Sequence, residues 1–200
     1  MAKRRDEASE GPRRELTFTE RARRGQLIES TIELVADNGY AGTSLAGIAE
    51  HAGITKAAVL YHFPSKDALV RDAYGHVLGA LVSEIAAVVG AAEVADGPAA
   101  YVRSMIGYLR DHPRHTRMIV EAMSHGDGDH ASNARWGPLA EIITAAQSAR
   151  GVRAGDARTI AIIVGGAIDA IVAERLHDPG YDTVTAAERL VQIVDVALAL

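Results

Sequence analysis

Apolar residues recur at helical spacing along most of the chain, and short polar or glycine-containing breaks divide this pattern into segments. The first segment predicts a helix that begins at Thr17 or Thr19 and ends at Asn38, before Gly39. Two short helices are expected within 43–66, followed by longer helices over about 66–89, 98–111, 112–123, 136–150, 155–176 and 183–200. No segment has the period of a strand. The pattern therefore predicts an all-α fold of nine helices.

The stretch 43–66, TSLAGIAEHAGITKAAVLYHFPSK, is the most informative part of this pattern. Its first helix has one apolar face because four residues recur at i, i+3, i+4 and i+7: Leu45, Ile48, Ala49 and Ala52. Thr43 or Ser44 is expected to cap this helix, and Thr55 the next one. Gly53 lies between them, where a glycine with positive φ ends a helix without a Cβ clash. This spacing predicts two helices joined by a tight turn.

The second short helix has an apolar side and a basic, aromatic side. Val59 and Phe63 are expected to face inward, and Pro64 ends the helix before Ser65 caps the long one that follows. Such a helix pair can place its second member in the major groove of duplex DNA. The residues predicted to contact phosphates or base edges are Thr43, Ser44, Thr55, Lys56, Ala57, Tyr61, His62 and Lys66.

The sequence GITKAAVLYHFPSKDAL, preceded by an amphipathic helix ending in Asn38-Gly39-Tyr40, resembles the DNA-binding domain of the TetR/AcrR-type transcriptional regulators. The resemblance covers roughly residues 19–75, and Leu60 departs from it by replacing an aromatic residue. It implies a homodimeric, cytoplasmic regulator, a repressor that binds a palindromic operator in double-stranded DNA and is released by a small apolar ligand. The expected division is a flexible arm (1–17), a helix-turn-helix domain (18–65) and a regulatory and dimerisation domain (66–200).

The charge distribution agrees with a DNA-binding N-terminal part. The net charge of the chain is −5, but residues 1–66 carry 10 Lys/Arg against 9 Asp/Glu, and residues 67–200 carry 11 against 17. DNA binding depends on the local patch rather than on the total. Ordinary scatter in charge is the alternative explanation.

The C-terminal part offers candidates for a ligand pocket and for a dimer. Methionine and aromatic side chains adapt to apolar guests, and the predicted pocket residues are Met105, Tyr108, Met118, Met123, His125 and Trp136. The same residues could be plain core. Gly165 and Gly166 let two helices approach closely, either within one subunit or between the helices 155–176 and 183–200 of two subunits. Some combination of the following residues is predicted to lie in that dimer interface: Ile160, Ile163, Val164, Ile168, Val191, Val194 and Leu198.

Two rival functions remain open. A metal-dependent hydrolase would use residues such as His112, His115, Asp127 and Asp129, but their spacing matches no complete ligand pattern, and there is neither G-x-S-x-G nor a glycine-rich phosphate loop. We therefore expect no enzyme, metal or cofactor. The second rival is a DNA-binding adaptor that responds to a protein partner. Because no cysteine is present, disulfides and thiolate sites are excluded. The segment Met1–Arg14 is charged, so no signal peptide is predicted there. Asp169 interrupts the apolar stretch 160–173, so no membrane span is predicted there either.

Overall fold

The computed structural model describes residues 17–125, 132–152 and 155–199. Within these ranges the chain forms nine α-helices, one short 3-10 helix and no strand, which confirms the predicted all-α fold. The α-helices are α1 (Phe18–Gly42), α2 (Leu45–His51), α3 (Lys56–His62), α4 (Lys66–Ala91), α5 (Gly97–Asp111), α6 (Pro113–His125), α7 (Ser132–Ala149), α8 (Ala157–His177) and α9 (Thr183–Ala199). The 3-10 helix η1 (Val94–Asp96), which was not predicted, precedes α5. Apart from Thr17, the predicted arm lies outside the described residues.

The two ends of α1 follow from local chemistry. Thr17 and Glu20 form a capping box: the Thr17 hydroxyl accepts from the Glu20 N–H at 3.2 Å, and the Glu20 carboxylate accepts from the Thr17 N–H at 2.8 Å. This assigns the cap to Thr17. At the other end Gly39 has φ of 71°, so the helix is interrupted one residue after its predicted end before a last turn continues to Gly42.

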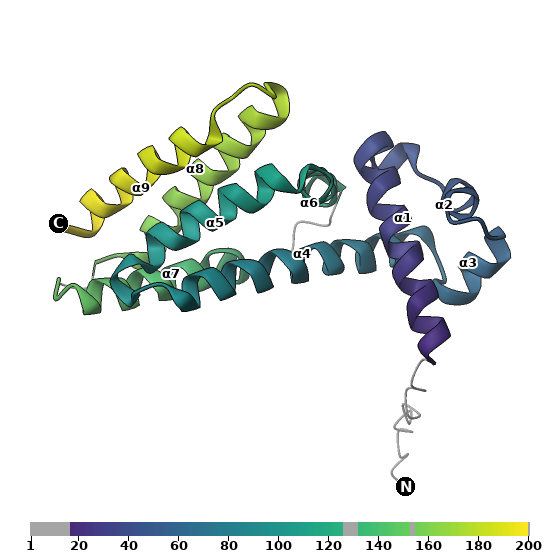
Figure 1. Ribbon diagram of the computed structural model, residues 1–200, viewed down its shortest axis with the longest axis horizontal. Coiled ribbons are helices and arrows are strands. Elements are labelled where there is room, and N and C mark those ends of the chain that lie inside the picture. The colour runs from purple at the N-terminus through teal and green to yellow at the C-terminus, as the bar shows by residue number, and fades with distance from the viewer. Residues whose placement is uncertain (1–16, 126–131, 153–154, 200) are drawn as a thin grey trace, which may run out of the picture.

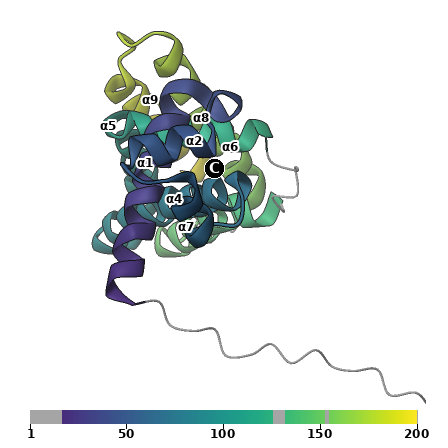
Figure 2. The same cartoon turned by 90° about the vertical axis from the view of Figure 1, so that its right-hand side faces the viewer.

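The helices are arranged along one long axis (Figure 1). Helices α1, α2 and α3 lie at one end, and α4 runs from them into the bundle formed by α5, α7, α8 and α9. Helix α6 lies between α5 and α1. Figure 2 views the molecule along this axis from the α1–α3 end.

Separate apolar clusters hold the two ends together. Side chains of α1, α2, α3 and the start of α4 form one core, which includes Leu27, Ile48, Val59, Phe63 and Leu69. A second and larger core joins α5, α7, α8 and α9. Between them a third cluster packs α1, α4 and α6 against one another. The end that carries the helix pair is therefore tied to the rest of the molecule by α4 and α6.

Among the described residues, α4 is the one helix that is long and apolar enough to cross a membrane, with a mean hydropathy of 1.5 over an 18-residue window. Only 22% of that window is buried within the chain. Even so, α4 contacts α1, α5 and α6, and Leu69, Val77 and Ile85 lie in three successive apolar clusters. We interpret α4 as the connecting helix that the sequence predicts.

Candidate DNA-binding surface

Helices α2 and α3 form the predicted pair with a tight turn. Gly53 has φ of 66°, and its N–H donates to the Glu50 carbonyl at 3.1 Å, while the Ile54 N–H donates to the Ala49 carbonyl at 2.9 Å. The Ser44 hydroxyl caps α2 by accepting from the Gly47 N–H at 3.1 Å. The Thr55 hydroxyl caps α3 by accepting from the Ala58 N–H at 3.2 Å. These bonds satisfy backbone donors that short helices otherwise leave open.

One side of α3 is fixed in the core and the other faces solvent. Val59 and Phe63 are 0% and 1% exposed, as the sequence predicts. On the opposite side the exposed residues are Thr55, Lys56, Ala57, Leu60 and Tyr61. This set is the exposed face of α3. Tyr61 is 71% exposed, and its hydroxyl donates to the Glu20 carboxylate at 3.3 Å.

His62 lies beside this face rather than on it. Its side chain is half-buried, and its ring meets the Tyr61 ring edge-on, with centroids 5.0 Å apart. Leu60, by contrast, is 43% exposed and lies on the face, although the sequence pattern does not predict it as a contact. Apolar side chains can contact the thymine methyl group, so Leu60 belongs among the candidate contacts.

Two predicted contact residues have structural roles. Thr43 is 4% exposed and its hydroxyl donates to the Gly39 carbonyl at 2.8 Å, which removes its side chain from the candidate surface. The Lys66 ammonium donates to the carbonyls of Tyr40 and Thr43 at 3.0 and 3.1 Å and lies 3.8 Å from the centre of the Tyr40 ring. A cation on the last carbonyls of α1 stabilises that helix end. A phosphate contact from Lys66 stays a prediction.

Arg24, a candidate phosphate contact by its place at the start of the first helix, has a structural role. Its guanidinium lies 4.0 Å from the centre of the Phe63 ring, donates to the His62 carbonyl, and pairs with Asp72 of α4 at 2.5 Å. Arg24 therefore joins α1, the end of α3 and α4. Arg21, one turn earlier, is exposed and has no ion pair within the described residues, so it remains available to an external anion. No signal in the sequence distinguishes these two arginines.

The predicted pocket residues are distributed over several clusters. Met118 is 0% exposed between α1 and α4, and Tyr108 is 3% exposed against α4. Met105 is half-buried beside Tyr108, Trp136 packs against Gly165, and Met123 is 44% exposed. The side chain of His125 lies outside the described residues. None of these residues lines the cavity of about 210 Å³ that the C-terminal helices enclose, and their role in ligand binding stays a prediction.

His112 and His115 are part of a ring stack instead of a group of metal ligands. The Tyr108 and His112 rings stack with centroids 4.1 Å apart, and the Tyr108 hydroxyl bonds His115 Nδ1 at 2.7 Å. Burial raises the pKa of Tyr108, and burial lowers the pKa of His115. Within the part of the chain that the structure describes, no three His, Asp or Glu side chains gather as metal ligands do. Asp127 and Asp129 lie outside that part.

Helices α8 and α9 turn an apolar surface to solvent. Ile163 is 63% exposed, and Ile193 and Val196 are each 64% exposed. The predicted interface is wrong for Val164, Ile168, Val191, Val194 and Leu198, which are 2–4% exposed because they pack against other helices of the same chain. Gly165 also packs within the chain: a Cβ atom there would lie 1.8 Å from the Trp136 ring, whereas Gly166 has open space.

Comparison with known proteins identifies this architecture. Residues 27–73 match the family described as "Bacterial regulatory proteins, tetR family". This segment holds the turn, the caps and the exposed face of α3. Residues 27–73 therefore resemble the DNA-binding segment of tetR-family regulators. The chain is thus similar to transcription regulators.

Individual relatives agree with this assignment. The chain is 36% identical over 84 residues to the HTH-type transcriptional regulator BetI of Burkholderia thailandensis and 41% identical over 56 residues to BetI of Paraburkholderia xenovorans. The first alignment covers 42% of each protein and the second 28% of this chain and 29% of its relative, so the chain matches less than half the length of either relative.

Solved structures resemble a larger part of the chain. A TetR-like transcriptional regulator from Rhodococcus sp. RHA1 has a TM-score of 0.72 at 20% identity and covers 88% of this chain and 96% of its own. FadR from Bacillus subtilis, solved in complex with stearoyl-CoA, has a TM-score of 0.68 at 18% identity and covers 85% and 96%. At these identities the likeness concerns the fold.

Proposed function

We propose that this chain is a homodimeric, sequence-specific TetR-family repressor whose α3 helices read a palindromic operator. The exposed face of α3 carries this proposal. Its five residues are presented on a helix whose opposite side is locked into the core by Val59 and Phe63. A recognition helix must be fixed in this way, because specific contacts depend on the register of its side chains in the major groove.

The cations near α3 support the same function. Lys56 lies in its first turn and Arg21 lies in the first turns of α1, and both are exposed without an ion pair within the described ranges. We assign phosphate contacts to these two residues, and base contacts to Ala57, Leu60 and Tyr61. Ser44 and Thr55 lie at the exposed starts of α2 and α3, where a helix N-terminus attracts phosphate.

A dimer is proposed because one short helix gives little specificity alone. Two copies related by a two-fold axis place two recognition helices about 34–36 Å apart, one turn of DNA. The exposed Ile163, Ile193 and Val196 on α8 and α9 supply an apolar surface for that contact. This surface lies on the bundle, away from α3, so dimerisation leaves the exposed face of α3 free (Figure 1).

We further propose that a small molecule controls DNA binding, since FadR, a solved structure of similar fold, binds stearoyl-CoA. The cavity in the C-terminal bundle favours this over an adaptor that responds only to a protein partner. The sequence favours a ligand at Met105, Tyr108, Met118, Met123, His125 and Trp136, and the cavity offers a second place for it.

The experiment that tests the proposed function selects DNA fragments of the host genome on the purified chain and measures their binding by fluorescence anisotropy. Lys56→Ala with Tyr61→Ala should weaken binding by about a hundredfold or more, since a phosphate contact and a recognition contact are lost together. Arg158→Ala, which removes one exposed cation from α8, is the matched control and should bind as the wild type does.

A further inference from the structure

A cavity of about 210 Å³ lies where the end of α5, the start of α6, the end of α8 and the start of α9 meet. Its apolar lining comes from Ile106, Leu109, Val172 and Leu176. It opens at its rim to solvent. The cavity lining contains no residue of the exposed face of α3. The cavity is therefore separate from the candidate DNA contacts.

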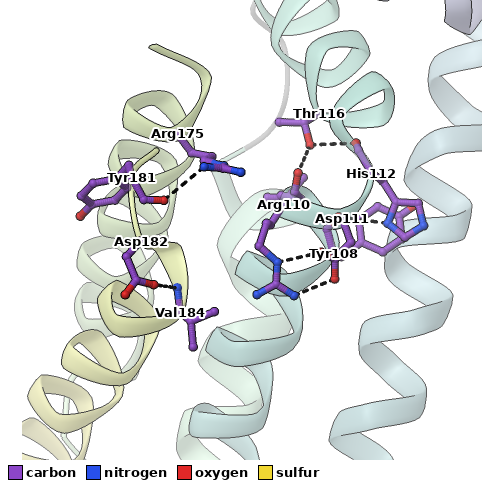
Figure 3. A network of polar contacts seen from close by, with 10 residues as sticks. Tyr108, Arg110, Asp111, His112, Thr116, Arg175, Tyr181, Asp182 and Val184 are labelled. Carbon is purple, nitrogen blue, oxygen red and sulfur yellow. Dashed lines mark hydrogen bonds and ion pairs between the residues drawn. The ribbon is translucent and has the colours of Figure 1, made fainter. Parts of the chain in front are cut away.

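Three arginines line the same cavity, one from each of three helices: Arg110 from α5, Arg117 from α6 and Arg175 from α8. No carboxylate lies in this lining. Figure 3 shows Arg175 reaching from α8 toward the junction of α5 and α6, where Arg110 and Thr116 lie. Three cations around an apolar hollow form a site for an anion that has an apolar body.

The pairing of these arginines differs. Arg110 is bound at two points by Asp111, with both N–O distances 2.7 Å. Arg175 donates only to the Tyr181 carbonyl, at 3.5 Å, and Arg117 has no hydrogen bond or ion pair within the described residues. Asp182 precedes the cavity residue Thr183 in the sequence. Its carboxylate accepts a hydrogen bond from the Val184 N–H at 3.0 Å and so caps α9. Arg117 and Arg175 are therefore the cations that can bind an external anion.

A threonine inside the cavity adds an unused polar group. Thr183 is 3% exposed and lines the cavity, and its hydroxyl makes no hydrogen bond to another described residue. The hydroxyl of Thr116 differs, because it donates to the Leu109 carbonyl at 2.6 Å. Among the described residues Gln147 Oε1 is the one fully buried side-chain polar atom without a partner, so the Thr183 hydroxyl still reaches solvent in the cavity and is available to a bound molecule.

We propose that this cavity binds a small amphipathic carboxylate, with its anionic head at Arg117 and Arg175 and its apolar body against Ile106, Leu109, Val172 and Leu176. The volume corresponds to about seven water molecules at roughly 30 Å³ each, which suits a guest of about ten non-hydrogen atoms. An uncharged guest of the same length would leave the two arginines without an anion and bind more weakly.

This inference rests on the proposed function, because it names the effector that controls DNA binding. Helix α6 connects the two sites. Its side toward the cavity carries Arg117, and its side toward α1 carries Arg114, which pairs with Glu33 at 2.7 Å, and the buried Met118. A ligand that draws Arg117 toward the cavity therefore changes how α6 packs on α1. A coupling of the usual size changes operator affinity about 5- to 150-fold.

Calorimetry with octanoate on the full chain tests the site, with octanol as the uncharged probe of equal length. Octanoate should bind at one site per chain, and octanol at least tenfold more weakly. Arg175→Gln with Arg117→Gln should weaken octanoate binding about ten- to a hundredfold, the loss expected for charge-assisted hydrogen bonds, and leave octanol unchanged. Arg158→Gln is the control, since it removes one cation from α8 outside the cavity and should bind octanoate normally.

Equal binding of the two probes, no saturable octanoate binding, or unchanged affinity in the double variant overturns the proposal. Val172→Trp, which fills the hollow and keeps all three arginines in the sequence, gives a second test: octanoate binding that survives in this folded variant contradicts the placement. Operator binding of the double variant without octanoate separates the two proposals. The double variant should bind the operator as tightly as the wild type does. If the chain binds the operator but does not bind octanoate, the proposed function stands and the proposed effector site is wrong.

Discussion

The carboxylate of Glu121, on α6, accepts a hydrogen bond from the backbone N–H of Tyr40, at the end of α1, with a distance of 2.8 Å. Gly39, the residue before Tyr40, has a positive φ that L side chains rarely adopt, and a Cβ atom there would lie 3.3 Å from the same carboxylate oxygen. This hydrogen bond joins α6, which lines the cavity, to α1, which packs against α2 and α3.

Removal of this bond should loosen the junction between α6 and α1. Glu121→Ala leaves the Tyr40 N–H without its acceptor and should lower the free energy of unfolding by about 1–3 kcal/mol, measured in urea. Glu121→Gln keeps an acceptor oxygen at the same position and should lose less. If both variants are as stable as the wild type, the contact does not hold the junction.

Lys56 and Lys66 should respond differently to the same substitution. Lys56→Ala removes a phosphate contact and should reduce the slope of log affinity against log salt by about 0.9, with no change in thermal stability. Lys66→Ala removes two bonds to the end of α1 and should lower stability by about 1–3 kcal/mol. A normal melting temperature for Lys66→Ala would show that its ammonium does not cap α1.

The dimer should depend on the apolar surface of α8 and α9. Ile163→Asp places a charge on this surface and should produce monomers at micromolar concentration in sedimentation, together with loss of operator binding. Val82→Asp on α4 is the matched control, because Val82 and Ile163 are both 63% exposed. A wild-type chain that sediments as a monomer at the same concentration contradicts the dimer.

Stability should depend on pH through His115. Burial lowers its pKa below the ordinary 6.5; His112 and His76 also lower it, and Glu29 opposes them. Between the two pKa values the unfolded chain binds a proton that the folded chain does not, so the free energy of unfolding falls as pH drops through 6.5 and levels off below the folded pKa.

His115→Asn, which keeps an acceptor for Tyr108, should show a shallower fall in the free energy of unfolding between pH 7.5 and 5. The exposed His177→Asn should follow the wild type, and equal curves for all three would exclude His115 as the source.

The helix pair was predictable from sequence because its signals are local. Ser44, Gly53 and Thr55 act on backbone groups within a few residues, and the spacing of Val59 and Phe63 determines which side of α3 is buried. The role of Lys66 could not be found in this way, since its acceptors, Tyr40 and Thr43, are more than twenty positions away. The same applies to Arg24 at Phe63.

The C-terminal site was less predictable because its residues come from helices that are distant in sequence. Met118 has the character of a pocket residue, but it packs into the cluster between α1 and α4. Arg117, its neighbour, lines the cavity. Which of two adjacent positions on α6 faces the cavity depends on how α6 packs against α1 and α5, and periodicity within α6 alone does not determine that. For Ile163 and Val164, similarly, the packing of α8 against α7 decides which is exposed.

Recognition of operator DNA by the exposed face of α3 can be measured by sequencing the genomic fragments that are retained at physiological salt. The comparison is between the wild-type chain and the folded Lys56→Ala, Tyr61→Ala variant. The wild type should enrich a small set of fragments that share a two-fold symmetric sequence, and the variant should not. Enrichment of the same fragments to the same degree by the variant would contradict recognition by the exposed face of α3.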